Sequence, residues 1–282
     1  MSKLYKKYLR KKDIQTLQEL TNEMREYNTI VTCMGLYNHG KSTLLNCLIN
    51  DYNLQTFKTA DIRETYKNKS VKYGDFTFVD TPGLNANKND DKRVMDAVKK
   101  SDINIFVHNV NTGEFVASEI DFFNSVKKYW SNPAEFLNRT IFVLSRIDEV
   151  NSKQDIISTA NRMKQQLNDI FNIKNIKIIP VSSIDYIDGK LENEKELVVD
   201  SNILKLEKEI RNIQSKFSKE IIETKKYRLS EYYDILIKQL NSKLQKKQLM
   251  LSSLIKEEAQ KSSDLVEIKK TLKKKYENLR SI

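Results

Sequence analysis

Glycine and proline are confined to one part of the chain, and this distribution constrains the fold more than any other feature. Among the 282 residues there are 6 glycines and 3 prolines, and all of them lie between Gly35 and Gly189. These residues mark turns, so their absence from 190–282 predicts long helices there. A domain built from short elements and tight turns must therefore lie upstream.

Short apolar runs alternate with polar stretches of helical length in that upstream region. The runs are rich in Ile, Val, Phe and Thr, as strands buried on both faces should be. They lie at 30–34, 76–79, 103–107, 140–144 and 176–181, and candidate helices lie between them at 41–50, 90–100, 117–130 and 153–171. The alternation predicts an α/β fold with a mostly parallel sheet and helices on both faces. A hairpin over 71–78 would add an antiparallel edge strand.

Both ends of the chain have helical patterns. Residues 2–27 predict an amphipathic helix, and apolar residues recur every three or four positions over 203–282, as in a coiled coil or helical bundle. A bundle that folds back and an extended stalk both fit this spacing. We therefore expect an N-terminal helix (1–27) that joins a bundle, an α/β domain (28–200) and a helical bundle or stalk (201–282).

The net charge of +11 comes entirely from the two ends. Residues 1–30 carry a net charge of +3 and residues 201–282 carry +9, so the middle is close to neutral. These basic segments could meet anionic lipid or RNA phosphate, or form solvated helix faces. The sequence has no apolar run of membrane-spanning length and begins without the apolar core of a signal peptide. With two unpaired cysteines in apolar stretches, this predicts a cytoplasmic protein.

A glycine-rich loop follows the first predicted strand and opens a helix. It runs from Gly35 to Ser42 and has the spacing G-x-x-x-x-G-K-S of a phosphate-binding loop. Backbone amides of such a loop converge on phosphate oxygens at a helix N-terminus. Lys41 should reach the β- and γ-phosphates, and the Ser42 hydroxyl should bind Mg²⁺. The nucleotide-binding residues predicted here are Gly35, Asn38, His39, Gly40, Lys41, Ser42 and Thr43.

Two further motifs stand at strand ends. Asp80 closes the run 76–79, and Gly83 follows in Asp-Thr-Pro-Gly. We expect Asp80 to hold Mg²⁺ through a water and the Gly83 amide to face the γ-phosphate, so that loss of this phosphate releases the next loop. After the run 140–144, Asp148 could accept two N–H groups of guanine while Arg146 stacks on the base.

Together these motifs resemble the first, third, fourth and fifth motifs of the TRAFAC GTPases. The fourth motif of that family usually reads Asn or Thr, then Lys, any residue and Asp. Here Asp148 matches the last position, and Ser145 and Arg146 replace the first two residues. Ser182 and Ser183 stand at its fifth motif, where a backbone amide would bond guanine O6. The resemblance implies GTP hydrolysis to GDP with Mg²⁺. It also implies a switch threonine that binds Mg²⁺, for which Thr56, Thr59 and Thr65 are candidates and Thr65 is preferred.

Two residues refine the resemblance. Leu84 follows Gly83, where Ras-like enzymes have a glutamine that orients water. Asn38 matches the asparagine that binds K⁺ in GTPases activated by dimerisation, where the ion acts as a charge clamp on the phosphates. The resemblance therefore assigns Lys41, Thr65, Gly83 and Asn38 to catalysis, with K⁺ as a further cofactor.

Helices before and after the core resemble those of bacterial dynamin-like proteins. That similarity implies a homodimer, or a pair with a related GTPase, through the nucleotide faces. It further implies anionic lipid as a partner and a peripheral position at the inner face of the membrane. The alternatives are a ribosome- or RNA-associated GTPase with basic extensions, and a coiled-coil adaptor whose nucleotide only gates assembly.

Overall fold

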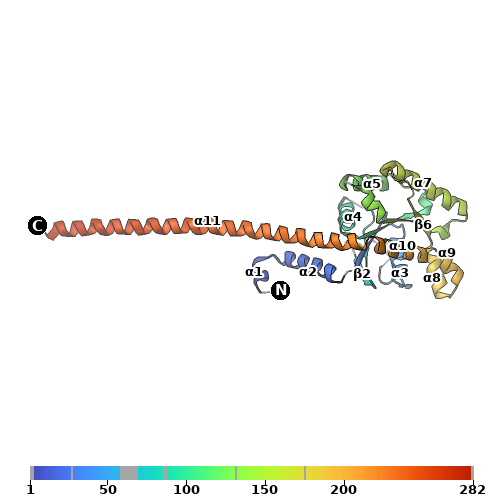
Figure 1. Cartoon of the computed structure of the whole chain (residues 1–282), viewed down its shortest axis with the longest axis horizontal. Coiled ribbons are helices and arrows are strands. Elements are labelled where there is room, and N and C mark those ends of the chain that lie inside the picture. Colours follow the sequence, from blue (N-terminus) through green and yellow to red (C-terminus); the bar gives the residue numbers. More distant parts are fainter. Residues whose placement is uncertain are drawn as a thin grey trace. The chain divides into compact units, whose positions relative to one another are not determined.

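The computed structural model describes residues 3–26, 28–57, 69–84, 88–130, 132–174 and 176–280. The chain divides into two compact units, coloured along the sequence in Figure 1. The sheet unit comprises Glu26–Ile222, and the helical unit comprises Met1–Arg25 together with Glu223–Ile282.

The sheet unit is built on a six-stranded sheet in the order β2-β3-β1-β4-β5-β6. Strands β3, β1, β4, β5 and β6 run parallel, and β2 pairs antiparallel with β3 at one edge. The predicted strands, the edge hairpin and the mostly parallel sheet are thereby confirmed. Their bounds are β1 Thr29–Met34, β2 Lys69–Tyr73, β3 Phe76–Asp80, β4 Ile103–Asn109, β5 Thr140–Ser145 and β6 Ile178–Val181.

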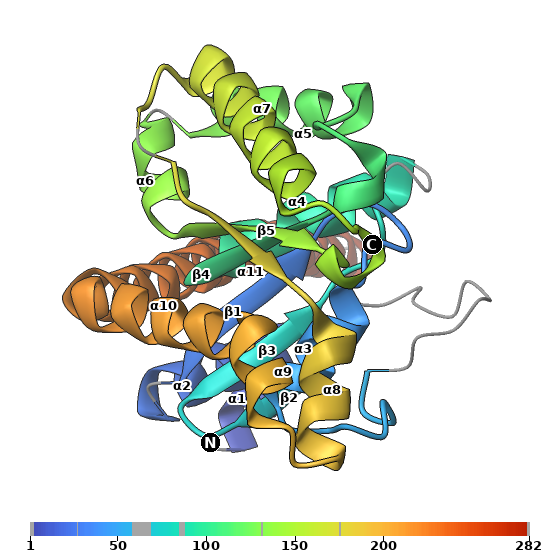
Figure 2. The ribbon, with the colours of Figure 1, turned by 90° about the vertical axis from the view of Figure 1, so that its right-hand side faces the viewer.

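Helices cover both faces of this sheet (Figure 2). One apolar cluster joins the sheet to α3 (Lys41–Leu48), α8 (Ser183–Leu191) and α10 (Ile203–Lys216), with α9 (Lys195–Asp200) beside α8. A second cluster, rich in phenylalanine, lies on the opposite face. It joins the sheet to α4 (Lys88–Lys100), α5 (Ala117–Tyr129), α6 (Pro133–Asn138) and α7 (Lys153–Phe171). Two short 3₁₀ turns follow strands, η1 at Val110–Thr112 and η2 at Ile147–Glu149.

Helix α10 departs from the predicted division of the chain. We expected residues from 201 onward to belong to the helical part, but Ile203, Leu206 and Ile210 are buried in the core of the sheet unit. The sequence predicted the helix correctly, but it did not predict that this helix packs on the sheet. An apolar stripe on a helix packs equally well on a sheet or on another helix, so periodicity alone does not identify the surface it covers.

The helical unit contains α1 (Lys3–Tyr8), α2 (Lys11–Glu26) and most of α11 (Ser218–Arg280). Helix α11 is continuous over 63 residues, which corresponds to about 95 Å at 1.5 Å per residue. Tyr232 of α11 donates a hydrogen bond to Asp13 at 3.3 Å, and Leu17 and Leu236 are both buried. Within this unit α2 therefore contacts α11 through the pair Asp13 and Tyr232. None of the helices in the described ranges is long and apolar enough to cross a membrane.

Candidate functional site

The parallel strands end at one edge of the sheet, and the predicted motifs meet there. The phosphate loop runs from the end of β1 to Lys41, the first residue of α3. Gly35 has φ +146°, and a Cβ there would lie 2.1 Å from the carbonyl oxygen of Val107. Gly40 has φ +84° and precedes α3 as its N-cap. Both positions need glycine, and together they direct the loop into the N-terminus of a helix, where anions are favoured.

Lys41 lies inside the loop rather than in solvent. Its side chain is buried, and its ammonium group donates a hydrogen bond to the Leu36 carbonyl oxygen at 2.8 Å. Burial lowers the pKa of Lys41, and the nearby carboxylate of Asp80 acts in the opposite direction. The loop therefore encloses a cation that lacks full solvation, and an entering phosphate would stabilise it.

Ser42 and Asp80 form the pair expected of a Mg²⁺ site. The Ser42 hydroxyl donates to Oδ2 of Asp80 at 2.7 Å. The other oxygen, Oδ1, is buried and has no hydrogen-bond partner among the described residues. Burial raises the pKa of Asp80, and the positive charge of Lys41 opposes that rise. A buried carboxylate oxygen with an unused acceptor beside a hydroxyl suits a hard cation with oxygen ligands, so these residues fit Mg²⁺.

The loop that follows Asp80 touches the phosphate loop. A Cβ on Gly83 would lie 2.7 Å from the backbone nitrogen of Tyr37, so a larger residue would push the two loops apart. The amide of Leu84 donates to the Gly35 carbonyl oxygen at 3.1 Å, and the Leu84 side chain is buried. Leu84 therefore helps to hold this contact and presents no group that could orient a water.

The predicted base-recognition motif is tied to the phosphate loop by two of its side chains. The buried Ser145 hydroxyl lies within hydrogen-bond distance of the carbonyl oxygens of His39 (2.8 Å) and His108 (3.0 Å). Arg146 donates to the Asn38 carbonyl oxygen at 3.0 Å. Asp148 lies in η2 and is exposed, so its carboxylate is accessible to a ligand.

The two serines after β6 differ in what they offer. The amide of Ser182 donates to the Ser201 carbonyl oxygen at 3.0 Å, and its side chain caps α8 by accepting from the Asp185 amide. Ser183 is the first residue of α8, where backbone amides lack intrahelical acceptors. Because the Ser182 amide is already used, the amide of Ser183 is the better candidate of the two for the predicted contact with guanine O6.

The candidate switch threonines are only partly described. Thr59 and Thr65 lie outside the described residues, whereas Thr56 is anchored to Asp51. Its amide donates to the Asp51 carboxylate at 2.6 Å, and a side-chain hydrogen bond from Thr56 is the main cause that lowers the pKa of Asp51. The next residue, Phe57, is clamped by both ends of the buried Asn46 amide, at 2.7 and 2.8 Å. Thr56 thus belongs to a fixed turn. Thr43 lies half-buried in the first turn of α3.

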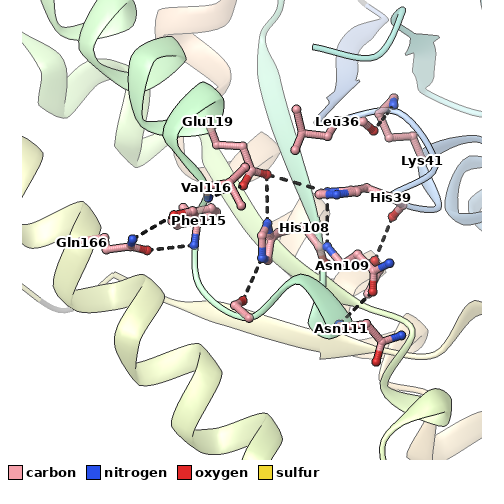
Figure 3. Close-up of polar contacts among 12 residues, drawn as sticks. Leu36, His39, Lys41, His108, Asn109, Asn111, Phe115, Val116, Glu119 and Gln166 are labelled. Atoms are coloured by element: carbon pink, nitrogen blue, oxygen red, sulfur yellow. Dashed lines mark hydrogen bonds and ion pairs between the residues drawn. The ribbon is translucent and has the colours of Figure 1, made fainter. Parts of the chain in front are cut away.

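The sequence analysis missed a buried polar cluster beneath the phosphate loop (Figure 3). His39, His108 and Glu119 come from the loop, the end of β4 and the first turn of α5, and each is buried. Burial lowers the pKa of His39 to about 3, with the neighbouring His108 as the next cause. The sequence held one indication of this cluster. The chain has two histidines, and both follow predicted strands, His39 in the phosphate loop and His108 directly after the run 103–107.

Sequence comparison finds a family model that matches part of the sheet unit and one relative. Residues 30–146 match the family described as 50S ribosome-binding GTPase. An uncharacterized protein of Acinetobacter baylyi is 31% identical over 175 residues, which are 61% of this chain and 39% of that protein. The chain therefore spans well under half the length of this relative.

Structural comparison extends the similarity beyond the sheet unit. The bacterial dynamin GTPase LeoA from ETEC has a TM-score of 0.55 at 17% identity, over 80% of this chain and 46% of that one. A chain of an oligomerised bacterial dynamin pair that senses and tethers membranes has a TM-score of 0.54 at 16% identity, over 92% of this chain and 47% of that one. At these identities the likeness concerns the fold.

Proposed function

We propose that this chain, which carries a P-loop GTPase domain, binds GTP with Mg²⁺ and hydrolyses it to GDP and phosphate. The observation that carries the proposal is the arrangement around the phosphate loop. There, Lys41 is enclosed by backbone and Ser42 is paired with a carboxylate that keeps one unused oxygen. Ser42 and Asp80 would hold Mg²⁺, which supplies positive charge to the phosphates when bound.

Each contributing residue has a distinct role in this proposal. The amides of the loop and the Lys41 ammonium bind and orient the phosphates. The Gly83 amide faces the γ-phosphate and senses its loss. Asp148 accepts the two N–H groups that guanine offers and adenine lacks, while Ser145 and Arg146 keep the base-recognition loop against the phosphate loop.

Competition titration tests this binding. We expect GTP to displace a fluorescent GDP from the wild-type chain far better than ATP does. EDTA or Asp80→Asn should weaken triphosphate binding by about tenfold or more, since a charge-assisted contact is worth about 1.5–3 kcal/mol. Asp75→Asn, in the turn between β2 and β3, serves as the matched control. Equal competition by ATP would refute guanine selectivity, and an unaltered Mg²⁺ requirement in Asp80→Asn would refute the metal assignment.

We further propose that hydrolysis is accelerated when two nucleotide faces pair. The buried Leu84 cannot orient a water, so the group that orients the attacking water must come from elsewhere. Asn38 is exposed on the phosphate loop, where its side chain could hold K⁺ beside the phosphates. Turnover per molecule should rise with protein concentration and fall when Na⁺ replaces K⁺. Asn38→Ala should abolish the K⁺ effect while it leaves GDP binding unchanged.

Membrane association is the second part of the proposal, and the bacterial dynamin likeness favours it over RNA binding. That likeness covers 80–92% of this chain, whereas the ribosome-binding family matches only residues 30–146. The exposed lysines near the end of α11 would meet anionic lipid; they are Lys269, Lys270, Lys273, Lys274 and Lys275. Co-sedimentation with anionic vesicles should decrease from low to physiological salt, and neutral vesicles should not bind. Preferential binding to ribosomal RNA would favour the alternative.

A further inference from the structure

The two histidines of the chain meet under the phosphate loop although they are 69 positions apart in sequence. Their ring centroids are 5.2 Å apart and their planes meet at 84°. Glu119, which is fully buried, lies beside both rings (Figure 3). The proposed binding of GTP gives no role to the side chains of this cluster, so their hydrogen bonds need their own explanation.

Each ring nitrogen of His108 lies at hydrogen-bond distance from an oxygen, and each of the two contacts needs a proton. Its Nε2 lies 2.9 Å from the carbonyl oxygen of Gly113, which can only accept, so Nε2 donates. Its Nδ1 lies 2.9 Å from Oε1 of Glu119, and this contact also needs a proton between the two atoms. That proton can reside on Nδ1 of an imidazolium or on a protonated carboxyl group.

The position of Glu119 favours the imidazolium. Glu119 is the third residue of α5, and its Oε2 accepts from the Val116 amide at 3.1 Å. A helix N-terminus and a donated amide hydrogen both stabilise a negative charge on the side chain. Glu119 is therefore a carboxylate, and His108 is its buried positive partner.

His39 completes the arrangement as a neutral ring. The Asn109 amide donates to His39 Nδ1 at 3.3 Å, so this nitrogen carries no proton. The same nitrogen lies 3.7 Å from Glu119 Oε1. Neither of these two atoms carries a proton, so the contact between them is electrostatically unfavourable, and the proton held between Glu119 and His108 lowers the negative charge at that oxygen. Without it, His39 would face a bare carboxylate and would have to turn or take up the proton.

We propose that Glu119 and His108 are positioning residues of the nucleotide site, which hold one proton between Oε1 and Nδ1 and thereby fix His39 and the phosphate loop. The loop is held on its other side by Ser145, which bonds the His39 carbonyl oxygen. The phosphate loop is therefore held at His39 in two ways, through the buried ring and through the carbonyl oxygen that Ser145 bonds. The affinity effect rests on the proposed nucleotide binding, whereas the proton assignment does not.

A metal ion is the competing occupant of this cluster. One donor atom from each of the three residues lies within 4.8 Å of the others. However, a metal bound to both Nδ1 atoms would displace the proton of His108 and the amide hydrogen of Asn109. Each donor atom is already satisfied by protein, so the proton accounts for the distances without a further ligand.

Imidazole nitrogen-15 NMR tests the proton assignment, because the chain has two histidines and His39→Gln assigns both. Near neutral pH we expect His108 to show two protonated nitrogens and His39 to show one. In Glu119→Gln the amide can donate to His108 Nδ1 and its oxygen can accept from Val116, so His108 should become neutral. A wild-type His108 with one bare nitrogen, or an equivalent of tightly bound metal in the purified protein, would overturn the proposal.

Variants at Glu119 test the positioning role. Glu119→Ala should weaken binding of fluorescent GDP by about tenfold or more, and Glu119→Gln should recover most of this loss because it keeps both hydrogen bonds. Asp121→Asn, an exposed carboxylate on the same helix, is the matched control and should bind as wild type. A folded Glu119→Ala protein with wild-type affinity would overturn the role.

Two further measurements test the proposal if Glu119→Ala does not fold or if the wild type binds no nucleotide. If Glu119→Ala does not fold, the His108 spectrum of Glu119→Gln still decides the proton assignment. If the wild type binds no nucleotide, the proposed function fails, and the backbone amide signals of Asn38 and Gly40 report the loop instead. Those signals should shift in Glu119→Ala and not in Asp121→Asn; unchanged signals would overturn the positioning role.

Discussion

Replacement of His39 by glutamine should remove a large part of the acid sensitivity of the sheet unit. Burial lowers the pKa of His39 from 6.5 to about 3. Between these values the unfolded chain binds a proton that the folded chain excludes, so the free energy of unfolding falls as the pH decreases. Above pH 6.5 the ring is neutral in both states, and His39 contributes no pH dependence.

The size of the effect follows from the shift. One pH unit inside this window costs about 1.4 kcal/mol of stability, so a decrease of two units should cost roughly 2–3 kcal/mol. His39→Gln lacks the titrating ring, and its amide oxygen can still accept from Asn109. The difference between the two pH profiles therefore separates the contribution of His39 from that of the carboxyl groups, which titrate in both proteins.

Urea unfolding followed by fluorescence is the assay. Trp130 is the single tryptophan of the chain, and its ring packs on Phe136 in the sheet unit at a centroid distance of 5.4 Å. As the pH decreases from 6.5, the free energy of unfolding of wild type should fall by about 1.4 kcal/mol more per pH unit than that of His39→Gln. Parallel profiles would show that His39 takes up protons freely in the folded state, which would refute its burial as a neutral ring.

Three further predictions concern separate parts of the molecule. Gly83→Ala should weaken triphosphate binding by about tenfold or more while GDP binding changes less, because the new Cβ would meet the Tyr37 backbone at 2.7 Å. Titrations with the two nucleotides check this, and equal effects on both would contradict the role of Gly83 at the γ-phosphate. Asp148→Asn should weaken GTP and favour xanthosine triphosphate in competition, and an unchanged preference would remove Asp148 from base recognition. Leu17→Ala, at a buried position, should destabilise the helical unit by about 2–5 kcal/mol. Thermal melting of the helical signal should show this loss, whereas the control Leu4→Ala, at an exposed position, should melt as wild type does. Equal melting of the two variants would contradict the packing of α2.

The order of elements in the sheet unit was predictable from sequence because each strand is a short apolar run and each helix has its own period. The edge hairpin was also predictable, since Gly74 and Asp75 form a turn between two short runs. The assignment of α10 was not, because the stripe of Ile203, Leu206 and Ile210 fits any apolar surface. Only the tertiary structure shows that this surface is the sheet.

The site shows the same contrast. Lys41, Ser42 and Asp80 follow strand ends, and parallel strands bring their ends together, so their meeting could be foreseen. The cluster of His108 and Glu119 could not, because it depends on how the first turn of α5 packs over the end of β4. Sequence spacing carries no information on that packing.

Phosphate release from GTP tests the central claim most directly. We expect the wild-type chain to release phosphate from GTP with Mg²⁺ and K⁺, and to release far less from ATP or in the presence of EDTA. Lys41→Ala, which removes the ammonium group enclosed by the loop, should abolish turnover while the protein remains folded by Trp130 fluorescence. Turnover of GTP that survives in Lys41→Ala, or equal turnover of ATP by wild type, would contradict the account.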